Sequence, residues 1–120
     1  MLESFSVYND QCPSHNVLEK ISDKWSILII NILLHKTLRF SELKRELNGI
    51  SPKMLTQTLN KLERLGFIHR KPFPILPMRV DYSLTSLGQE LGVILNSLKI
   101  WTETNIATIM SAEKKFIESC

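Results

Sequence analysis

The sequence has few of the features that mark secreted, membrane-spanning or disordered proteins. Two cysteines in 120 residues are too few for a disulfide scaffold. The most apolar run, residues 25–34, is too short for a membrane span. Four glycines and five prolines leave little room for low-complexity segments, and the N-terminus shows no export signal. We therefore expect a single cytoplasmic domain over residues 1–120, with its core at about 12–101 and a helical extension over 102–120.

Positive charge is concentrated in the middle of the chain. Residues 36–79 contain ten Lys or Arg against three Glu, whereas the other residues contain five basic and nine acidic side chains. A basic middle between acidic ends indicates an anionic partner for the middle segment. Charge alone does not establish nucleic-acid binding, because many solvated surfaces are also uneven.

Apolar spacing predicts three helices in the first part of the chain, over residues 14–22, 24–34 and about 40–47. The second is apolar nearly all round and is predicted to form the core. The third is expected to have Ser41 as its N-cap. Asn48-Gly49 then predicts a turn.

A fourth helix is predicted from Ser51, a favourable N-cap, to Gly66, which suits a left-handed C-terminal cap. Helical spacing places Leu55, Leu59 and Leu62 on one face. The opposite face gathers polar side chains: Lys53, Gln57, Asn60 and Arg64, with Thr56 and Lys61 at its flanks. On an isolated helix, such a face is more often solvated than functional.

Two alternating segments, residues 67–71 and 79–84, predict strands joined by a tip over 72–78 that three prolines stiffen. Thr85 then caps another helix over 86–101, and a last helical stretch runs to about residue 117. Two helices joined by a glycine-containing turn and followed by a β-hairpin form a winged helix-turn-helix. The predicted fold is therefore mainly α with a small β-hairpin.

Several blocks resemble the HxlR-type winged helix-turn-helix transcriptional regulators of the MarR-like superfamily. They are CP at residues 12–13, KW at 24–25, RFSEL at 39–43, GISPKMLTQTLNKLERLG at 49–66 and PMRVDYSLTSLG at 77–88. The resemblance covers about residues 12–101. It implies a homodimer paired through the first and C-terminal helices, an operator of two half-sites, a recognition helix at 51–65 and a wing at 67–84. The wing tip, PFPILPM, is more apolar than is usual in the family.

Within that context, the polar face of the fourth helix becomes the candidate for base contacts. Gln57 and Asn60 suit adenine, Lys53 suits guanine or phosphate, and Met54 suits a thymine methyl. The first part of a recognition helix makes most of the contacts, so the candidates are Ser51, Lys53, Met54, Thr56, Gln57 and Asn60. Phosphate or minor-groove contacts are expected from Lys61 and Arg64 on the helix and from Arg70, Lys71 and Arg79 at the base of the wing. For Arg39, Lys44 and Arg45, a backbone contact and a solvated position are equally favoured.

Cys12 precedes the first helix, whose dipole can lower a thiol pKa towards the reactive thiolate. Some members of the resembled family sense oxidants or electrophiles through a cysteine at this position. The alternative is a small apolar residue at a dimer interface. His15 and His69 would add positive charge if they lie close to Cys12, and pairing with Cys120 cannot be argued from sequence.

The sequence favours a dimeric DNA-binding regulator, with repression as the expected effect and a small molecule or electrophile as a candidate inducer. The alternative is a winged-helix protein-interaction module that binds no DNA. An enzyme is not expected, because no nucleophile elbow, phosphate loop or paired carboxylates are present. The histidines and cysteines lack metal-ligand spacing, so neither a metal nor a cofactor is expected.

Overall fold

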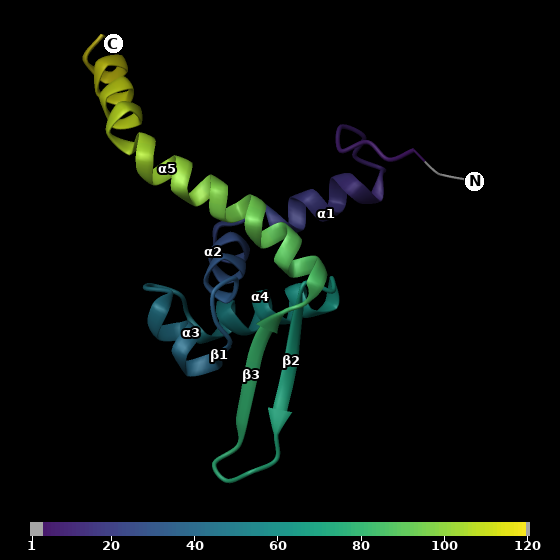
Figure 1. Ribbon diagram of the computed structural model, residues 1–120. Coiled ribbons are helices and arrows are strands. Elements are labelled where there is room, and N and C mark those ends of the chain that lie inside the picture. The colour runs from purple at the N-terminus through teal and green to yellow at the C-terminus, as the bar shows by residue number, and fades with distance from the viewer. Residues whose placement is uncertain (1–3, 120) are drawn as a thin grey trace.

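The computed structural model describes residues 4–119, which form a mainly helical structure with a small antiparallel sheet (Figure 1). The fold class predicted from the sequence is thus confirmed. The helices and strands, in chain order, are α1 (Pro13–Ile21), α2 (Lys24–Leu33), β1 (Leu38–Arg39), α3 (Phe40–Glu46), α4 (Pro52–Arg64), β2 (Ile68–Phe73), β3 (Arg79–Leu84) and α5 (Ser86–Glu118).

The sheet has three strands in the order β1-β3-β2, one strand more than the predicted hairpin. β1 was not predicted, because two residues are too few to show strand alternation. Its register pairs Leu38 with Tyr82, and both side chains are buried. β1 therefore joins the helical part of the protein to the hairpin.

β2 is also longer than predicted, since it continues through Pro72 to Phe73. A proline has no N–H for a strand ladder, but β2 lies at the sheet edge, where a proline is tolerated. The hairpin tip is therefore residues 74–78 rather than 72–78.

The prediction that Ser41 caps α3 is wrong. The helix begins at Phe40, and Arg39 occupies the capping position. The backbone N–H of Arg39 is satisfied by the Glu42 carboxylate at 2.9 Å, in the manner of one half of a capping box. Because Arg39 is still paired with β3, the chain passes directly from strand to helix, and Ser41 falls inside the first turn.

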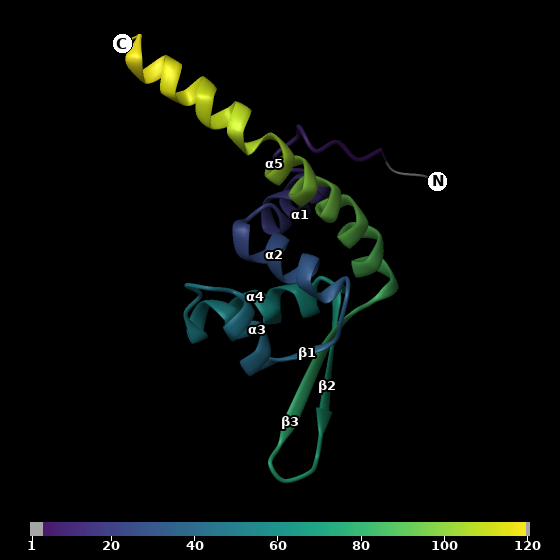
Figure 2. The ribbon, with the colours of Figure 1, turned by 60° about the vertical axis from the view of Figure 1, so that its left-hand side comes forward.

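The core lies around α2, which contacts α5 on one side and α4 on the other (Figure 2). Ile29 and Ile30 of α2 are fully buried, as the apolar character of this helix predicted. Leu43 of α3 and Leu55 and Leu62 of α4 are also fully buried. Figures 1 and 2 show the wing projecting from the opposite side of this core to α5.

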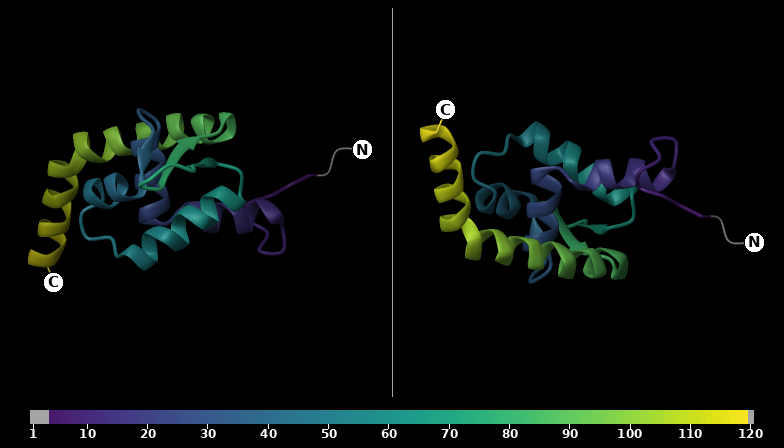
Figure 3. Two further views of the ribbon diagram at one scale, coloured as in Figure 1. Left: turned by 90° about the horizontal axis from the view of Figure 1, so that it is seen from below. Right: turned by 90° about the horizontal axis from the view of Figure 1, so that it is seen from above.

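α5 is one continuous helix of 33 residues, where the sequence suggested a helix followed by a separate helical stretch. Thr85 caps it as predicted, with its hydroxyl oxygen 3.0 Å from the Gly88 N–H that donates to it. The same hydroxyl donates to the Gly66 carbonyl at 2.6 Å, so the end of α4 and the start of α5 share one side chain. The C-terminal part of α5 bends away from its first part (Figure 3).

Gly88 stands where α5 passes the start of the wing, and a Cβ there would collide with the Phe67 carbonyl oxygen. That oxygen also accepts from the Thr85 N–H at 3.0 Å, which limits its movement. We expect Gly88→Ala to lower the free energy of unfolding by about 1–3 kcal/mol, measured by urea denaturation.

The matched control is Gly92→Ala. Its new methyl group would lie 2.8 Å from Cδ1 of Leu34, a side-chain atom that can move, so the loss in free energy of unfolding should be smaller than for Gly88→Ala. Equal stability of Gly88→Ala and the wild type would show that the backbone here is not confined.

Candidate nucleic-acid interface

The orientation of α4 is set by its buried face. Leu55, Leu59 and Leu62 are at most 2% exposed, as their spacing predicted. Thr58 is buried beside them, and its hydroxyl donates to the Met54 carbonyl at 2.7 Å. Burying these side chains holds the helix at one rotation about its axis. The opposite face must therefore point outwards.

The helix begins and ends as its capping residues predicted. The Ser51 hydroxyl accepts from the Met54 N–H at 3.0 Å, and Pro52 occupies the first turn. Gly66 closes the helix with a φ of 87°, a left-handed conformation that glycine adopts without steric cost. The Ser51 hydroxyl oxygen thus already accepts a hydrogen bond from the first turn of α4, although the residue remains exposed.

The outward face of α4 carries polar side chains that the rest of the protein does not engage. We call Lys53, Thr56, Gln57, Asn60 and Arg64 the α4 polar face; all five are exposed. Within residues 4–119, none of these five side chains has a hydrogen bond, ion pair or ring contact. Met54 lies next to it and is 41% exposed. Donors, acceptors and positive charge are thus held on a fixed helix and left available.

Lys61 differs from these residues, because its Nζ lies 2.7 Å from Oδ1 of Asp23. Asp23 also caps α2, accepting from the N–H of Ser26 at 3.2 Å and from its hydroxyl at 2.7 Å. Lys61 therefore fastens α4 to the start of α2. Partial burial by itself raises the pKa of Asp23, but the hydrogen bonds from Lys61 and Ser26 outweigh it and lower that pKa.

The basic residues of the wing lie further out than their predicted place at its base. Phe73 pairs with Arg79 and Lys71 with Asp81, so Lys71 and Arg79 stand close to the tip. The Arg79 guanidinium donates to both carboxylate oxygens of Asp81, at 2.8 and 2.9 Å. These hydrogen bonds lower the pKa of Asp81 and raise that of Arg79. Arg79 is thus held in one position, with much of its charge compensated.

The Phe73 ring is flanked by two cations. The Lys71 Nζ lies 5.3 Å and the Arg79 Cζ 5.0 Å from the ring centroid, within the range of cation–π attraction. Arg70 is exposed and has no ion pair within the described residues. Beyond this basic section, the tip is apolar, and Leu76 is almost fully exposed.

The residues at the start of the helix-turn-helix add a little more positive charge. Arg39 lies 3.6 Å from Glu42 and opposite Asp81 in the sheet. Lys44 and Arg45 are exposed on α3 and form no ion pair within residues 4–119. The structure therefore leaves Lys44 and Arg45 available to a phosphate, while Arg39 has a carboxylate partner in Glu42.

Cys12 occupies the N-cap position of α1, away from α4 and the wing, and is 9% exposed. Its Sγ lies 3.1 Å from the Ser14 hydroxyl and accepts from the Ser6 N–H at 3.3 Å. The hydrogen bond with the Ser14 hydroxyl is the largest cause that lowers the pKa of this thiol. The His15 ring nitrogen Nδ1 bonds the Val7 carbonyl at 2.7 Å instead of the thiol. Cys120 lies outside the described residues.

No cluster of three or more potential metal ligands occurs in the part of the chain that the structure describes. No helix within residues 4–119 combines the length and apolar character that a membrane span needs.

Comparison with known proteins agrees with this arrangement. Residues 20–110 match the HxlR-like helix-turn-helix family. The chain belongs to the HxlR family. An HTH-type transcriptional regulator of Escherichia coli K12, YtfH, is 38% identical over 92% of this chain and 87% of its own length. HxlR-type and MarR-family proteins of this kind are transcriptional regulators, and the protein is one of them.

Two solved structures place this HxlR-family chain among proteins of the same architecture. YtfH from Salmonella typhimurium, described as a transcriptional regulator, has a TM-score of 0.87 and 37% identity, covering 92% of this chain and 99% of that one. The redox regulator HypR, in its reduced form, has a TM-score of 0.75 and 33% identity, covering 82% of this chain and 98% of that one.

Two of the ion pairs that the sequence analysis did not predict, Arg79–Asp81 and Lys61–Asp23, differ in how far the sequence indicated them. Arg79 and Asp81 are two residues apart on one strand, so their side chains share a face, and this spacing was a usable signal. Lys61 and Asp23 are 38 residues apart, and nothing in the HxlR-like motif indicated their contact.

Because the Lys61–Asp23 ion pair joins α4 to the start of α2, removing Lys61 should affect stability. We expect Lys61→Met to lower the free energy of unfolding by under about 1 kcal/mol at neutral pH, the range of a partly exposed ion pair. Because folding lowers the pKa of Asp23, this difference should be present above the ordinary aspartate pKa and vanish as the pH falls below its folded value.

The measurement is urea denaturation of both proteins across that pH range, with Lys53→Met as a matched change on the α4 polar face. The structural role of the Lys61–Asp23 ion pair is refuted if the Lys61 and Lys53 variants show the same pH dependence.

Proposed function

We propose that this protein is a repressor that binds, as a homodimer, an operator of two half-sites. In this proposal α4 enters the major groove of each half-site and the β2–β3 wing lies against the neighbouring backbone. The observation that carries the proposal is the α4 polar face, which is exposed and unpaired on a helix whose opposite side is locked in the core. Occupying the operator would exclude the polymerase.

The chemistry of the face suits base recognition in duplex DNA. The side-chain amides of Gln57 and Asn60 can donate to N7 and accept from N6 of adenine in the major groove. Lys53 suits guanine or a phosphate. Met54 supplies an apolar contact for a thymine methyl. Ser51, Thr56 and Arg64 fit phosphate contacts along the same face. Lys61 is assigned to its ion pair with Asp23. Its contribution to DNA binding is mainly non-specific positive charge.

On the wing, the basic residues without a carboxylate partner are the better candidates for phosphate contacts. Arg70 and Lys71 have no carboxylate partner within residues 4–119, whereas Arg79 is fixed by Asp81. We assign Arg70 and Lys71 to the DNA backbone and give Arg79 a smaller share, through a guanidinium that Asp81 orients. The sequence had treated these three residues alike.

The dimer is proposed from apolar surface that one chain leaves uncovered. α1 buries none of its residues fully, and Val17 and Leu18 are exposed on it. α5 exposes Ile94, Leu98 and Trp101 among others. Exposed apolar area of this extent is typical of an interface. Pairing through α1 and α5 would bury it and give the dimer two copies of α4, one for each half-site.

Replacing the α4 polar face should remove sequence-specific binding. The Lys53→Ala and Gln57→Ala variants are each expected to weaken operator binding by about 1–3 kcal/mol and to relax specificity. The measurement is fluorescence anisotropy with operator and scrambled duplexes at one salt concentration. Arg70→Ala is the matched control, because it should weaken both duplexes alike.

Full operator affinity in the triple Ala variant at Lys53, Gln57 and Asn60 would contradict the assignment of α4 as the recognition helix.

The alternative function is a protein-interaction module that binds no DNA. It predicts no steep fall of duplex affinity with rising salt, whereas the proposal does.

A second element of the proposal concerns the signal. We propose that an electrophile or oxidant reaches this regulator through Cys12, whose thiol pKa is lowered by the Ser14 hydroxyl. The similarity to HypR, a redox regulator, supports this assignment. A thiolate at the start of α1 would lie next to the proposed dimer surface, so its modification would disturb the pairing of the two chains.

The thiolate fraction can be measured as the rate of Cys12 alkylation by iodoacetamide against pH. Because the pKa is lowered, the rate should reach half its maximum at a lower pH than for a free cysteine. Ser14→Ala removes the main cause and should move the curve to higher pH. Cys120→Ser serves as the background for all proteins, and an unshifted Ser14→Ala curve would contradict the proposed cause.

A further inference from the structure

The hairpin tip, residues 74–78, presents large apolar side chains to the solvent. Leu76 is 99% exposed, Met78 74% and Ile75 57%. Three such side chains gathered on one tip differ from apolar residues scattered singly over a surface, and they indicate a contact site. The proposed pairing through α1 and α5 does not cover them, because the wing projects from the opposite side of the core to α5 (Figures 1 and 2).

The tip is stiff as well as apolar. Three prolines in the segment PFPILP, residues 72–77, each fix the backbone φ. The Ile75 N–H donates to the Phe73 carbonyl at 2.9 Å. The Phe73 ring is flanked by the cations of Lys71 and Arg79, at 5.3 and 5.0 Å from its centroid. The tip therefore loses little conformational freedom when it binds a partner.

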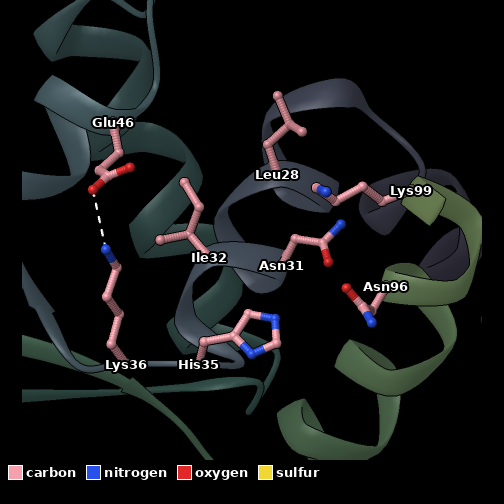
Figure 4. A pocket seen from close by; sticks show the side chains of 8 residues that line it. All are labelled: Leu28, Asn31, Ile32, His35, Lys36, Glu46, Asn96 and Lys99. Atoms are coloured by element: carbon pink, nitrogen blue, oxygen red, sulfur yellow. Dashed lines mark hydrogen bonds and ion pairs between the residues drawn. The ribbon is translucent and has the colours of Figure 1, made fainter. Parts of the chain in front are cut away.

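The apolar surface of the tip differs in shape from that between α2 and α5. Between those helices, Leu28 and Ile32 line a hollow of about 390 Å³. Lys36 and Glu46 stand at its rim, paired at 3.1 Å (Figure 4). A hollow receives a group from a partner, whereas a projecting tip is inserted into one. The partner of the tip must therefore offer a narrow recess that leads to apolar surface.

The charge behind the tip indicates which partner this is. Arg70 and Lys71 have no carboxylate partner within residues 4–119, and β2, which carries them, contacts α4. A duplex offers two ridges of phosphate with the apolar faces of stacked bases between them. A lipid surface is met by a broad apolar face, such as that of an amphipathic helix, rather than by one narrow tip. Cations followed by an apolar end therefore suit DNA.

The length of the tip fits the minor groove. Leu76 is three residues beyond Phe73, so it lies at most about 10 Å past the last pair of the hairpin. The minor groove is about 7.5 Å deep. When Arg70 and Lys71 meet the phosphates, Leu76 therefore reaches the base pairs.

We propose that the hairpin tip enters the minor groove beside each half-site, where Leu76 inserts between two base pairs, unstacks them and kinks the operator. Ile75 and Met78 pack beside it against the sugars of the groove. Leu, Ile and Met are among the side chains that form such wedges in proteins that bend DNA. This inference rests on the proposed DNA-binding function and adds a bend that base contacts from α4 do not require.

The wedge gives the protein a sequence preference at a position where it makes no hydrogen bond to a base. Pyrimidine–purine steps such as TA unstack most easily, whereas A-tracts are stiff. A TA step where Leu76 inserts therefore lowers the cost of the kink. The operator is selected at that step through deformability, and within each half-site through the α4 polar face.

The bend is measured on the full chain with a duplex that the wild type selects from a random-sequence pool. Donor and acceptor dyes at the two ends report their separation by energy transfer, and anisotropy of the same duplex reports binding. At saturation, the wild type should bend the duplex by roughly 20–90° at each wing. Permanganate, which oxidises unstacked thymines, should react most strongly beside each half-site.

Leu76→Ser removes the wedge, and Leu76→Met is the matched control that keeps an apolar one. Because Leu76 is almost fully exposed, neither change should alter folding. Leu76→Ser should lose the bend and the permanganate signal, and Leu76→Met should keep both. The apolar burial that is lost and the unstacking cost that is avoided offset each other, so affinity should change by under about tenfold. Bending is therefore the decisive readout.

A change in the DNA tests the same contact from the other side. Replacing the step with the strongest permanganate signal by AA should weaken binding of the wild type at least threefold. It should leave binding of Leu76→Ser unchanged, because that variant does not unstack the step.

Two results would overturn the wedge while leaving the proposed function in place. One is saturated binding of a duplex that stays straight, and the other is an equal bend by the wild type and Leu76→Ser. A tip that instead contacts another protein or a lipid surface would give one of these results. Absence of duplex binding by the wild type would overturn the proposed function, and the wedge with it.

Discussion

The packing of α4 on α2 is the constraint on which the rest of the structure depends. Leu55, Leu59 and Leu62 are nearly inaccessible, and each contributes on the order of 2 kcal/mol by leaving water. Rotating α4 by half a turn would expose these three side chains and bury the charged ones. The same burial that stabilises the fold therefore decides which residues of α4 face outwards. The outward face carries exposed polar side chains.

Charge pairing then sorts the basic residues into two groups. Lys61 and Arg79 have carboxylate partners, at Asp23 and Asp81, and hold elements in place. Lys53, Arg64 and Arg70 have no such partner within residues 4–119. A count of positive charge along the sequence treats all five alike. The structure separates those that position the helix and wing from those left available to an anion.

Local signals in the sequence were enough to predict most of the helices and the wing. Ser51, Gly66 and Thr85 act through hydrogen bonds or backbone conformations a few residues away, so their effects are visible in a short stretch. β1 was missed because two residues carry no periodicity and its pairing with β3 spans more than forty positions. Lys61 was assigned to phosphate because its partner is distant in sequence. The apolar stripe of α5 was visible, but a single chain does not show what covers Ile94 or Trp101.

The central claim is that the outward face of α4 contacts bases in the major groove. Dimethyl sulfate footprinting of the bound operator tests it directly, because the reagent modifies guanine N7, which lies in that groove. The account predicts two protected clusters about 34–36 Å apart, one for each α4 of a dimer. The clusters should be lost in the triple Ala variant at Lys53, Gln57 and Asn60. Binding that leaves every N7 reactive, or an unchanged footprint in that variant, would contradict the claim.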